Sequence, residues 1–285
     1  AAHEEHARAW RQLGMLDQRF GVATGPARNA LLQSREGLRR RVRKLGRGVA
    51  SVVLFGGLAL FAGERYLPMD YWLADQRTAT GEQRTLRLAD GTVINLNTHS
   101  ALDVRFDEKQ RRIVLQEGEI LIETGHNDSR PFIVETRDGR MRALGTRFLV
   151  KREDQGTRLG VLQSAVAARP QAGQDEQVFK EGQQVLIRRD GLGPLQALNL
   201  GADAWTRGML VVDNARLGDL IDELGRYRRG HLGVAPEVAD LRITGSFPLQ
   251  DTDLALNALL PTLPVKIERH TAWWVTVVAK ADAKR

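Results

Sequence analysis

The chain has 285 residues, which suggests two or three domains, and a formal net charge of +7 at pH 7. It contains no cysteine, which excludes disulfides, thiolate metal sites and a cysteine nucleophile. The positive charge is confined, because residues 1–47 hold eleven basic and four acidic side chains, whereas the residues after 47 hold 31 of each. Without a second basic patch interleaved with aromatic residues, the composition argues against nucleic-acid binding.

Residues 4–20 are predicted to form an amphipathic helix, because apolar side chains such as Trp10, Leu13 and Leu16 recur at near-helical spacing. A single helix of this kind cannot bury its apolar stripe, so it must pack on other helices or on a partner. The chain starts with Ala1 inside this pattern and not with methionine. We therefore expect that further sequence precedes it.

Residues 48–64 are predicted to form a transmembrane helix. The stretch 48–63 carries no charge, and seven of the thirteen residues 35–47 are Lys or Arg. This basic flank predicts a single pass, with residues 1–47 in the cytoplasm and the C-terminus on the opposite side of the membrane. Sixteen uncharged residues rise about 24 Å as a helix, short of a hydrocarbon core of about 30 Å, so flanking arginines must snorkel to the interfaces. The membrane-flanking candidates are Arg40, Arg41, Arg43, Lys44 and Arg47.

Three other interpretations of this stretch remain open. It could be a buried core helix, a cleaved signal peptide with an unusually long charged leader, or a twin-arginine export signal at residues 39–41. Aromatic residues beyond the stretch favour a membrane helix, because Tyr66, Tyr71 and Trp72 suit the outer interface.

Residues 78–192 are predicted to form an all-β domain. Short runs alternate apolar and polar side chains, as half-buried strands do, and Asp-Gly dipeptides at residues 90, 138 and 190 indicate turns between them. The spacing of about ten residues is typical of a sandwich, a roll or a solenoid. The runs are 92–97, 102–106, 112–116, 120–123, 132–136 and 147–152.

Within this domain some residues have predicted structural roles. Gly91, Gly139 and Gly182 are expected to supply positive φ in tight turns. The expected core residues are Leu115, Phe132, Ile133 and Phe148. The acidic residues Glu117, Glu119 and Glu123 are expected on solvated strand faces, although a glycosidase pair among them is a second interpretation.

Residues 203–280 are predicted to form a small α/β module of two βαβ-like units, which makes the whole chain multi-domain α+β. Residues 209–212 are an expected strand, and Asp213 and Asn214 are expected to cap a helix of residues 217–227. A second cap is expected at residues 251–253. The module ends in a predicted hairpin of residues 265–268 and 273–278, with the turn at residues 270 and 271.

Few residues indicate catalysis. The sequence contains no Walker loop, GxGxxG or GxSxG motif, and His3 and His6 lack a nearby third metal ligand. We therefore predict no enzymatic activity, no cofactor and no metal, and we expect a protein that binds partners and transmits a signal.

The order of several motifs resembles the FecR family of membrane-anchored sigma regulators. The motifs are Leu88-Ala-Asp90-Gly91-Thr92 with Leu96-Asn97 and Ser100; Arg112, Leu115, Gly118 and Glu119; Pro131 to Val134; Leu144 to Val150; Lys180 to Gln184; Ala204 to Gly208; and Leu224 to Tyr227. Residues 162–166 depart from the family, which usually has glutamate and glycine before the valine. Together the motifs cover about 150 residues.

This resemblance implies a periplasmic FecR β domain of roll or solenoid type and a C-terminal module like the signalling domains of secretins and TonB-dependent receptors. It also implies that the cytoplasmic segment binds an extracytoplasmic-function sigma factor. Residues 10–13 resemble a conserved segment of that sigma-binding domain, with Gln12 where the family has arginine. The family's cytoplasmic domain is longer than residues 1–47. The sigma-binding candidates are Trp10, Arg11, Leu13 and Leu16.

The periplasmic partner expected from this resemblance is the signalling domain of a TonB-dependent siderophore receptor. Trp273 and Trp274 are the receptor-binding candidates, one predicted to face the core and the other solvent, because neighbours in a strand alternate. Signal transfer is expected through proteolysis in the membrane, which Gly56, Gly57 and Gly63 would permit by local unwinding. The alternative function is a membrane-anchored periplasmic assembly or glycan-binding protein.

Overall fold

The computed structural model describes residues 69–125, 128–173, 175–271 and 273–280. These residues belong to one compact unit that begins at Met69. The predicted transmembrane helix at residues 48–64 lies outside the described residues. Within the described ranges, none of the helices has the length and apolar character needed to cross a bilayer.

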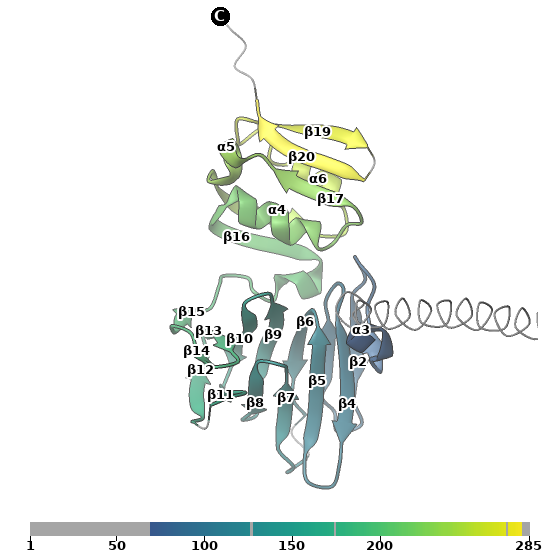
Figure 1. Cartoon of the computed structure of the whole chain (residues 1–285), viewed down its shortest axis with the longest axis vertical. Helices are drawn as coiled ribbons and strands as arrows, with labels where there is room; N and C mark the ends of the chain where they lie inside the picture. Colours follow the sequence, from purple (N-terminus) through teal and green to yellow (C-terminus); the bar gives the residue numbers. More distant parts are fainter. Residues whose placement is uncertain (1–68, 126–127, 174, 272, 281–285) are drawn as a thin grey trace, which may run out of the picture. The chain divides into compact units, whose positions relative to one another are not determined.

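The first part of the unit, here called the β lobe, contains two sheets (Figure 1). In spatial order the first sheet consists of β1 (Gln76–Arg77), β4 (Ala101–Phe106), β5 (Arg111–Glu117), β7 (Phe132–Glu135), β8 (Gly139–Ala143), β11 (Ala165–Pro170) and β12 (Gln177–Lys180). The second consists of β14 (Gly191–Leu192), β13 (Gln183–Arg188), β10 (Gly156–Gln163), β9 (Arg147–Glu153), β6 (Glu119–Glu123), β3 (Val93–Leu96) and β2 (Arg84–Arg87), and β15 (Gln196–Ala197) pairs with β13.

The all-β prediction for this region is confirmed. The chain passes back and forth between the two sheets, and every neighbouring pair is antiparallel except β5 and β7. Antiparallel pairing distinguishes this roll from a solenoid of stacked parallel coils.

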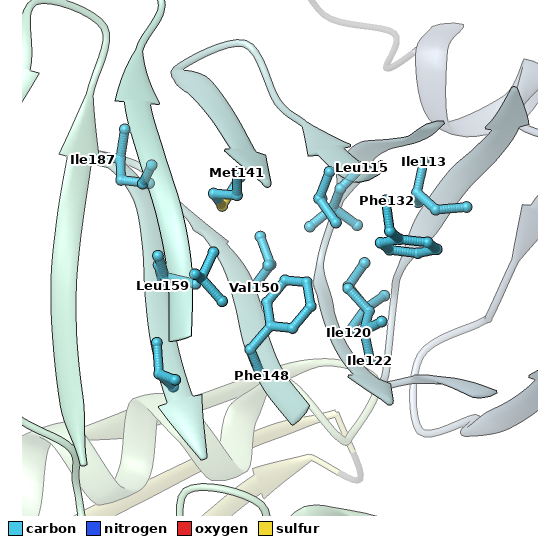
Figure 2. Packing of buried hydrophobic residues seen from close by; sticks show 14 of the residues in the cluster. Ile113, Leu115, Ile120, Ile122, Phe132, Met141, Phe148, Val150, Leu159 and Ile187 are labelled. Carbon is cyan, nitrogen blue, oxygen red and sulfur yellow. The ribbon is translucent and has the colours of Figure 1, made fainter. Parts of the chain in front are cut away.

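The core of the β lobe lies between the two sheets. Figure 2 shows side chains of both sheets pointing into one interior, among them Phe132 from β7 and Phe148 from β9. Phe132, Phe148 and Leu115 are at most 1% exposed and belong to this cluster, as predicted. Ile133 is also buried, as expected.

The Asp-Gly turn after β2 shows why its residue types are needed. Gly91 has φ of +81°, and Asp90 accepts hydrogen bonds from the backbone N–H and the hydroxyl of Thr92. Arg111 binds Asp90 at 2.7 Å, and both side chains are almost fully buried. The turn is therefore fixed to β5 by a desolvated ion pair.

The predicted positive φ is confirmed for Gly91 and Gly182 but is wrong for Gly139. Gly139 is required for another reason. A Cβ atom at this position would lie 2.5 Å from the carbonyl oxygen of Arg169 and 2.9 Å from a methyl carbon of Ile187. The missing side chain permits close approach of β11 to β8.

Ser164 lies in the stretch 162–166 that departs from the FecR-like pattern, and its φ is +66°. This conformation costs L-residues about 1–2 kcal/mol. We expect Ser164→Gly to raise the free energy of unfolding by about 0.5–1 kcal/mol, because relief of this strain exceeds the added entropy of the unfolded chain. Urea unfolding of both proteins measures the difference. A less stable variant would show that the weak bond from the Ser164 hydroxyl to the Leu144 carbonyl at 3.3 Å dominates.

The C-terminal module follows the 3-10 helix η1 (Ala204–Arg207) and contains two small sheets. One sheet pairs β16 (Met209–Arg216) with β18 (Arg242–Pro248), and the other has the order β17 (His231–Val234), β20 (Trp274–Ala279), β19 (Val265–Thr271). The helices are α4 (Leu217–Gly225), α5 (Pro236–Ala239) and α6 (Thr252–Asn257).

The strands and helices occur in the predicted order, but the βαβ pairing is wrong. β16 pairs with β18 in antiparallel fashion, and β17 pairs in parallel with β20, so α4 joins strands of different sheets. The predicted helix at residues 217–227 is confirmed as α4, which ends at Gly225. Its buried residues recur at helical spacing and are Leu217, Gly218, Leu220, Ile221 and Leu224.

One helix cap is confirmed and the other is wrong. Asp251 accepts a hydrogen bond from the N–H of Leu254 at 2.9 Å and begins α6. Asp213 and Asn214 instead lie within β16, at an irregularity in its pairing with β18. The residue before α4 is Arg216, which provides no side-chain cap. The strand therefore continues past the residues that resemble a cap.

The short helix α3 (Met69–Leu73) corrects the prediction for Tyr71. Tyr71 is only 8% exposed, and its hydroxyl donates a hydrogen bond to the carbonyl of Thr78 at 2.7 Å. It therefore anchors α3 on the β lobe and is not a free aromatic residue at a membrane interface. Trp72 is 58% exposed, and Tyr66 lies outside the described residues.

Candidate partner-binding site

Most of the predicted site residues precede the described part of the chain. The sigma-binding candidates are Trp10, Arg11, Leu13 and Leu16, and the membrane-flanking candidates are Arg40, Arg41, Arg43, Lys44 and Arg47; all of them lie outside the described residues. The structure therefore describes the receptor-binding candidates in the C-terminal module.

Both tryptophans of the C-terminal hairpin face solvent. Trp273 is 60% exposed and Trp274 is 52% exposed, so the prediction that one of them is buried is wrong. Trp273 lies in the turn before β20, where strand alternation does not apply. The inward positions of β20 are Val275 and Val277, which are at most 1% exposed.

The two tryptophans are held in place by the neighbouring strand β17. The ring of His231 lies 4.5 Å from the ring of Trp274, and the N–H of His231 donates to the carbonyl of Trp273 at 2.6 Å. Gly230 permits this approach, since a Cβ atom there would lie 2.3 Å from the same carbonyl oxygen. We call His231, Trp273 and Trp274 the tryptophan tip.

The strand beside the tip, β19, has one unpaired edge among the described residues. The N–H of Lys280 donates to the carbonyl of Pro264, so alternate residues from Pro264 face β20. The backbone groups of Ile267 and Arg269 consequently point toward the open edge. Such an edge can accept a partner strand through main-chain hydrogen bonds.

A second group of functional interest joins the β lobe to the module. Arg226, at the end of α4, binds Glu119 of β6 at 3.1 Å and also pairs with Glu223 of α4. Lys151 of β9 binds Glu223 at 2.7 Å. These four charges balance and connect two strands of the lobe to one helix of the module.

Hydrogen bonds to Asn97 extend this group. The Asn97 amide nitrogen donates to the Tyr227 hydroxyl at 2.7 Å and to Glu119 at 2.9 Å. Asn97 is fully buried, and Tyr227 is 8% exposed. We call Asn97, Glu119, Lys151, Glu223, Arg226 and Tyr227 the interlobe cluster.

The expectation that Glu119 is solvated is wrong, because it is only 7% exposed. The sequence signal for its role was its place in the FecR-like motif with Gly118. The partner in the module lies 107 residues away, which no local pattern reveals. With Glu119 bound by Arg226 and Asn97, the structure gives no support to a glycosidase pair at this position.

Burial and pairing shift the ionisation of the cluster. Burial alone would raise the pKa of the Glu223 carboxyl, but Lys151 and Arg226 outweigh burial and hold that pKa below its ordinary value. Burial alone would lower the pKa of Arg226, but Glu223 and Glu119 raise it. Burial, with Glu119 and Glu223, raises the pKa of the Tyr227 phenol. At neutral pH Glu223 is therefore an anion, Arg226 is a cation and the Tyr227 phenol is neutral.

The lowered pKa of Glu223 predicts a contribution to acid stability. The unfolded carboxyl titrates near its ordinary pKa of about 4.3, so the stabilisation is complete above that pH and is lost as pH falls through the lower folded pKa. We expect the free energy of unfolding of Glu223→Gln to fall less steeply than that of the wild type as pH drops below about 4.3, by up to about 1.4 kcal/mol per pH unit. Urea unfolding at several pH values measures the slope, and equal slopes would contradict the assignment.

Among the residues that the structure describes, no three His, Asp or Glu side chains are arranged to hold a metal ion. Beside the interlobe cluster lies a groove of about 310 Å³, bordered by the apolar residues Leu149, Leu210 and Leu220 and by the paired charges of Lys151 and Glu223. The groove and the cluster both occupy the junction between lobe and module.

Comparison with known proteins distinguishes the β lobe from the C-terminal module. The sequence profile described as FecR protein matches residues 74–167, which lie in the β lobe. No curated protein sequence matches the chain significantly.

Three chains of solved structures match the fold. Two are crystal structures, at 2.50 Å and 1.65 Å resolution, of a candidate anti-sigma factor from Parabacteroides distasonis ATCC 8503. The first has a TM-score of 0.59 and 21% identity, and the match covers 72% of this chain and 97% of that one. The second has a TM-score of 0.59 and 22% identity, with 71% and 96% covered.

At these identities the likeness shows the fold alone. Residues 74–167 of the β lobe match the FecR profile, and the resemblance to the FecR family, first seen in the order of the motifs, is confirmed.

Proposed function

We propose that this protein is a membrane-anchored regulator that controls an extracytoplasmic-function sigma factor. Residues 1–47 bind the sigma factor in the cytoplasm, a helix at residues 48–64 crosses the inner membrane once, and the FecR domain and module lie in the periplasm. The FecR domain carries the proposal, because it is matched by sequence and is continuous with a fold shared with a candidate anti-sigma factor. The proposed function includes no catalytic step.

We further propose that the module binds the signalling domain of a TonB-dependent siderophore receptor. The tryptophan tip supports this, because two half-exposed tryptophans beside an open strand edge combine a hot-spot residue type with a site for strand addition. Occupation of the module by the receptor would then change the activity of the sigma factor, with proteolysis in the membrane as the proposed route.

The tryptophan tip can be tested by substitution. We expect Trp273→Ala and Trp274→Ala each to weaken binding to the receptor signalling domain by about 2 kcal/mol, or about 30-fold, because each removes a large exposed aromatic anchor. Isothermal titration measures the dissociation constants. Trp72→Ala is the matched control, since Trp72 is similarly exposed but lies on α3, and it should bind like the wild type. Normal binding by both folded tip variants would rule out this surface.

Sigma control needs a separate experiment. Deleting residues 1–47 should abolish control of sigma-dependent transcription, measured with a reporter, while receptor binding by the periplasmic part persists. Unchanged control by the truncated protein would contradict the cytoplasmic assignment.

A further inference from the structure

The turn of residues 97–100, which joins β3 to β4, contacts the C-terminal module. Asn97 binds the Tyr227 hydroxyl through its side-chain amide, and the Thr98 hydroxyl donates to the carbonyl of Arg226 at 3.0 Å. Asn97 and Thr98 are fully buried. The start of the turn is thus fixed to the segment that ends α4.

The same turn also contacts α3. The His99 ring stacks on the Tyr71 ring, with centroids 4.6 Å apart and an interplanar angle of 21°. The Tyr71 hydroxyl donates to the carbonyl of Thr78, and the Thr78 hydroxyl donates to the carbonyl of Asn97 at 2.6 Å. Two routes, a ring stack and a pair of hydrogen bonds, therefore connect the turn with α3. This helix begins at Met69, shortly after the predicted membrane span ends at residue 64.

The geometry leaves the turn little freedom to deform by itself. His99 has φ of +49°, an unusual value for a residue with a side chain, and its N–H donates to the Ala79 carbonyl at 3.2 Å. Gly118 packs so closely that a Cβ atom would lie 2.6 Å from the His99 carbonyl oxygen. The turn is therefore held by the module, by Ala79 and by the close packing of Gly118.

We propose that the 97–100 turn is the coupling element that transmits movement of the C-terminal module to α3, with the His99–Tyr71 stack as its output contact. The role of this coupling in signalling rests on the function proposed above. The mechanical coupling between the module and α3 is independent of that function. Packed side chains and hydrogen bonds that span two moving parts are the physical means of such coupling.

Hydrogen exchange at the α3 amides tests the coupling in the full-length protein without a receptor. Tyr227→Phe removes the hydroxyl bonded to Asn97, and it should raise exchange at α3 by about fivefold, the change for one lost hydrogen bond of about 1 kcal/mol. In a His99→Asn background, Asn keeps the left-handed backbone but removes the ring stack. There Tyr227→Phe should have a clearly smaller effect on α3, because only the hydrogen-bond route through Thr78 and Tyr71 remains.

Trp72→Ala provides the matched background, because it truncates an aromatic ring of α3 that does not contact the turn; the fivefold effect should persist there. The proposal is overturned if Tyr227→Phe leaves α3 exchange unchanged in the wild-type background, or raises it equally in the His99→Asn background. Either result is independent of whether any receptor binds.

An experiment in cells tests whether the coupling is used in signalling. His99→Asn should bind the receptor signalling domain with wild-type affinity but lose induction of sigma-dependent transcription. Full induction by this variant would refute the coupling role. Failure of the wild-type protein to bind the receptor domain would refute the proposed receptor, and the exchange result would still decide the coupling.

Discussion

Replacing Arg226 by alanine is expected to lower the free energy of unfolding by about 3–5 kcal/mol, the usual cost of removing one partner from a buried ion pair. Three quarters of the Arg226 side chain is buried, and its partner Glu119 has a side-chain exposure of 9%. Lys151 still compensates Glu223 in the variant, but no cation replaces Arg226 at Glu119. The variant therefore loses stabilising free energy at the contact between the β lobe and the C-terminal module.

Urea unfolding, followed by tryptophan fluorescence, measures this effect. Arg216→Ala is the control, because Arg216 precedes the same helix and binds Asp240 at 2.5 Å, but the two side chains are 46% and 82% exposed. We expect the control to change stability by at most about 0.5 kcal/mol. Equal effects of the two substitutions would show that the interlobe cluster does not hold the unit together.

Gly118→Ala is expected to cost about 4 kcal/mol or more, or to prevent folding. Gly118 has φ of +82°, and a Cβ atom there would lie 2.3 Å from the Ser100 hydroxyl oxygen and 2.5 Å from the Ser100 Cα atom. The backbone strain contributes about 1–2 kcal/mol, and the overlap with backbone atoms contributes the remainder. Thermal unfolding, or the yield of soluble protein, reports the loss.

Gly182→Ala separates the cost of backbone strain from the cost of steric overlap. Gly182 has nearly the same φ, +79°, but nothing lies within 4 Å of a Cβ atom at this position. We expect it to cost only the backbone strain of about 1–2 kcal/mol. If both variants are equally stable, close packing between residue 118 and the 97–100 turn is not the reason for glycine there.

Local patterns were sufficient to predict most strands, the core and α4. Phe132 and Phe148 each begin a short run of three apolar residues, and Leu217, Leu220 and Leu224 recur at helical spacing, so the burial of each follows from its own segment. Whether such a residue is buried depends on the spacing of apolar residues along its own segment, which can be read from a single sequence.

Features that depend on distant segments could not be predicted. Glu119 looks like a solvated strand residue until Arg226, 107 residues later, is placed against it. Tyr71 is buried because His99 and Thr78 cover it, and Trp273 faces solvent because the turn extends to that residue. Tertiary contacts overrode the local rule at Glu119 and Tyr71, and an extended turn did so at Trp273.

The most direct measurement is purification of the full-length protein from membranes of iron-starved cells of its native host, followed by identification of the proteins that co-elute. We expect one extracytoplasmic-function sigma factor and one TonB-dependent receptor, with the receptor lost from the Trp273→Ala and Trp274→Ala variants. Intact, folded protein that elutes with neither partner would contradict sigma regulation across the membrane.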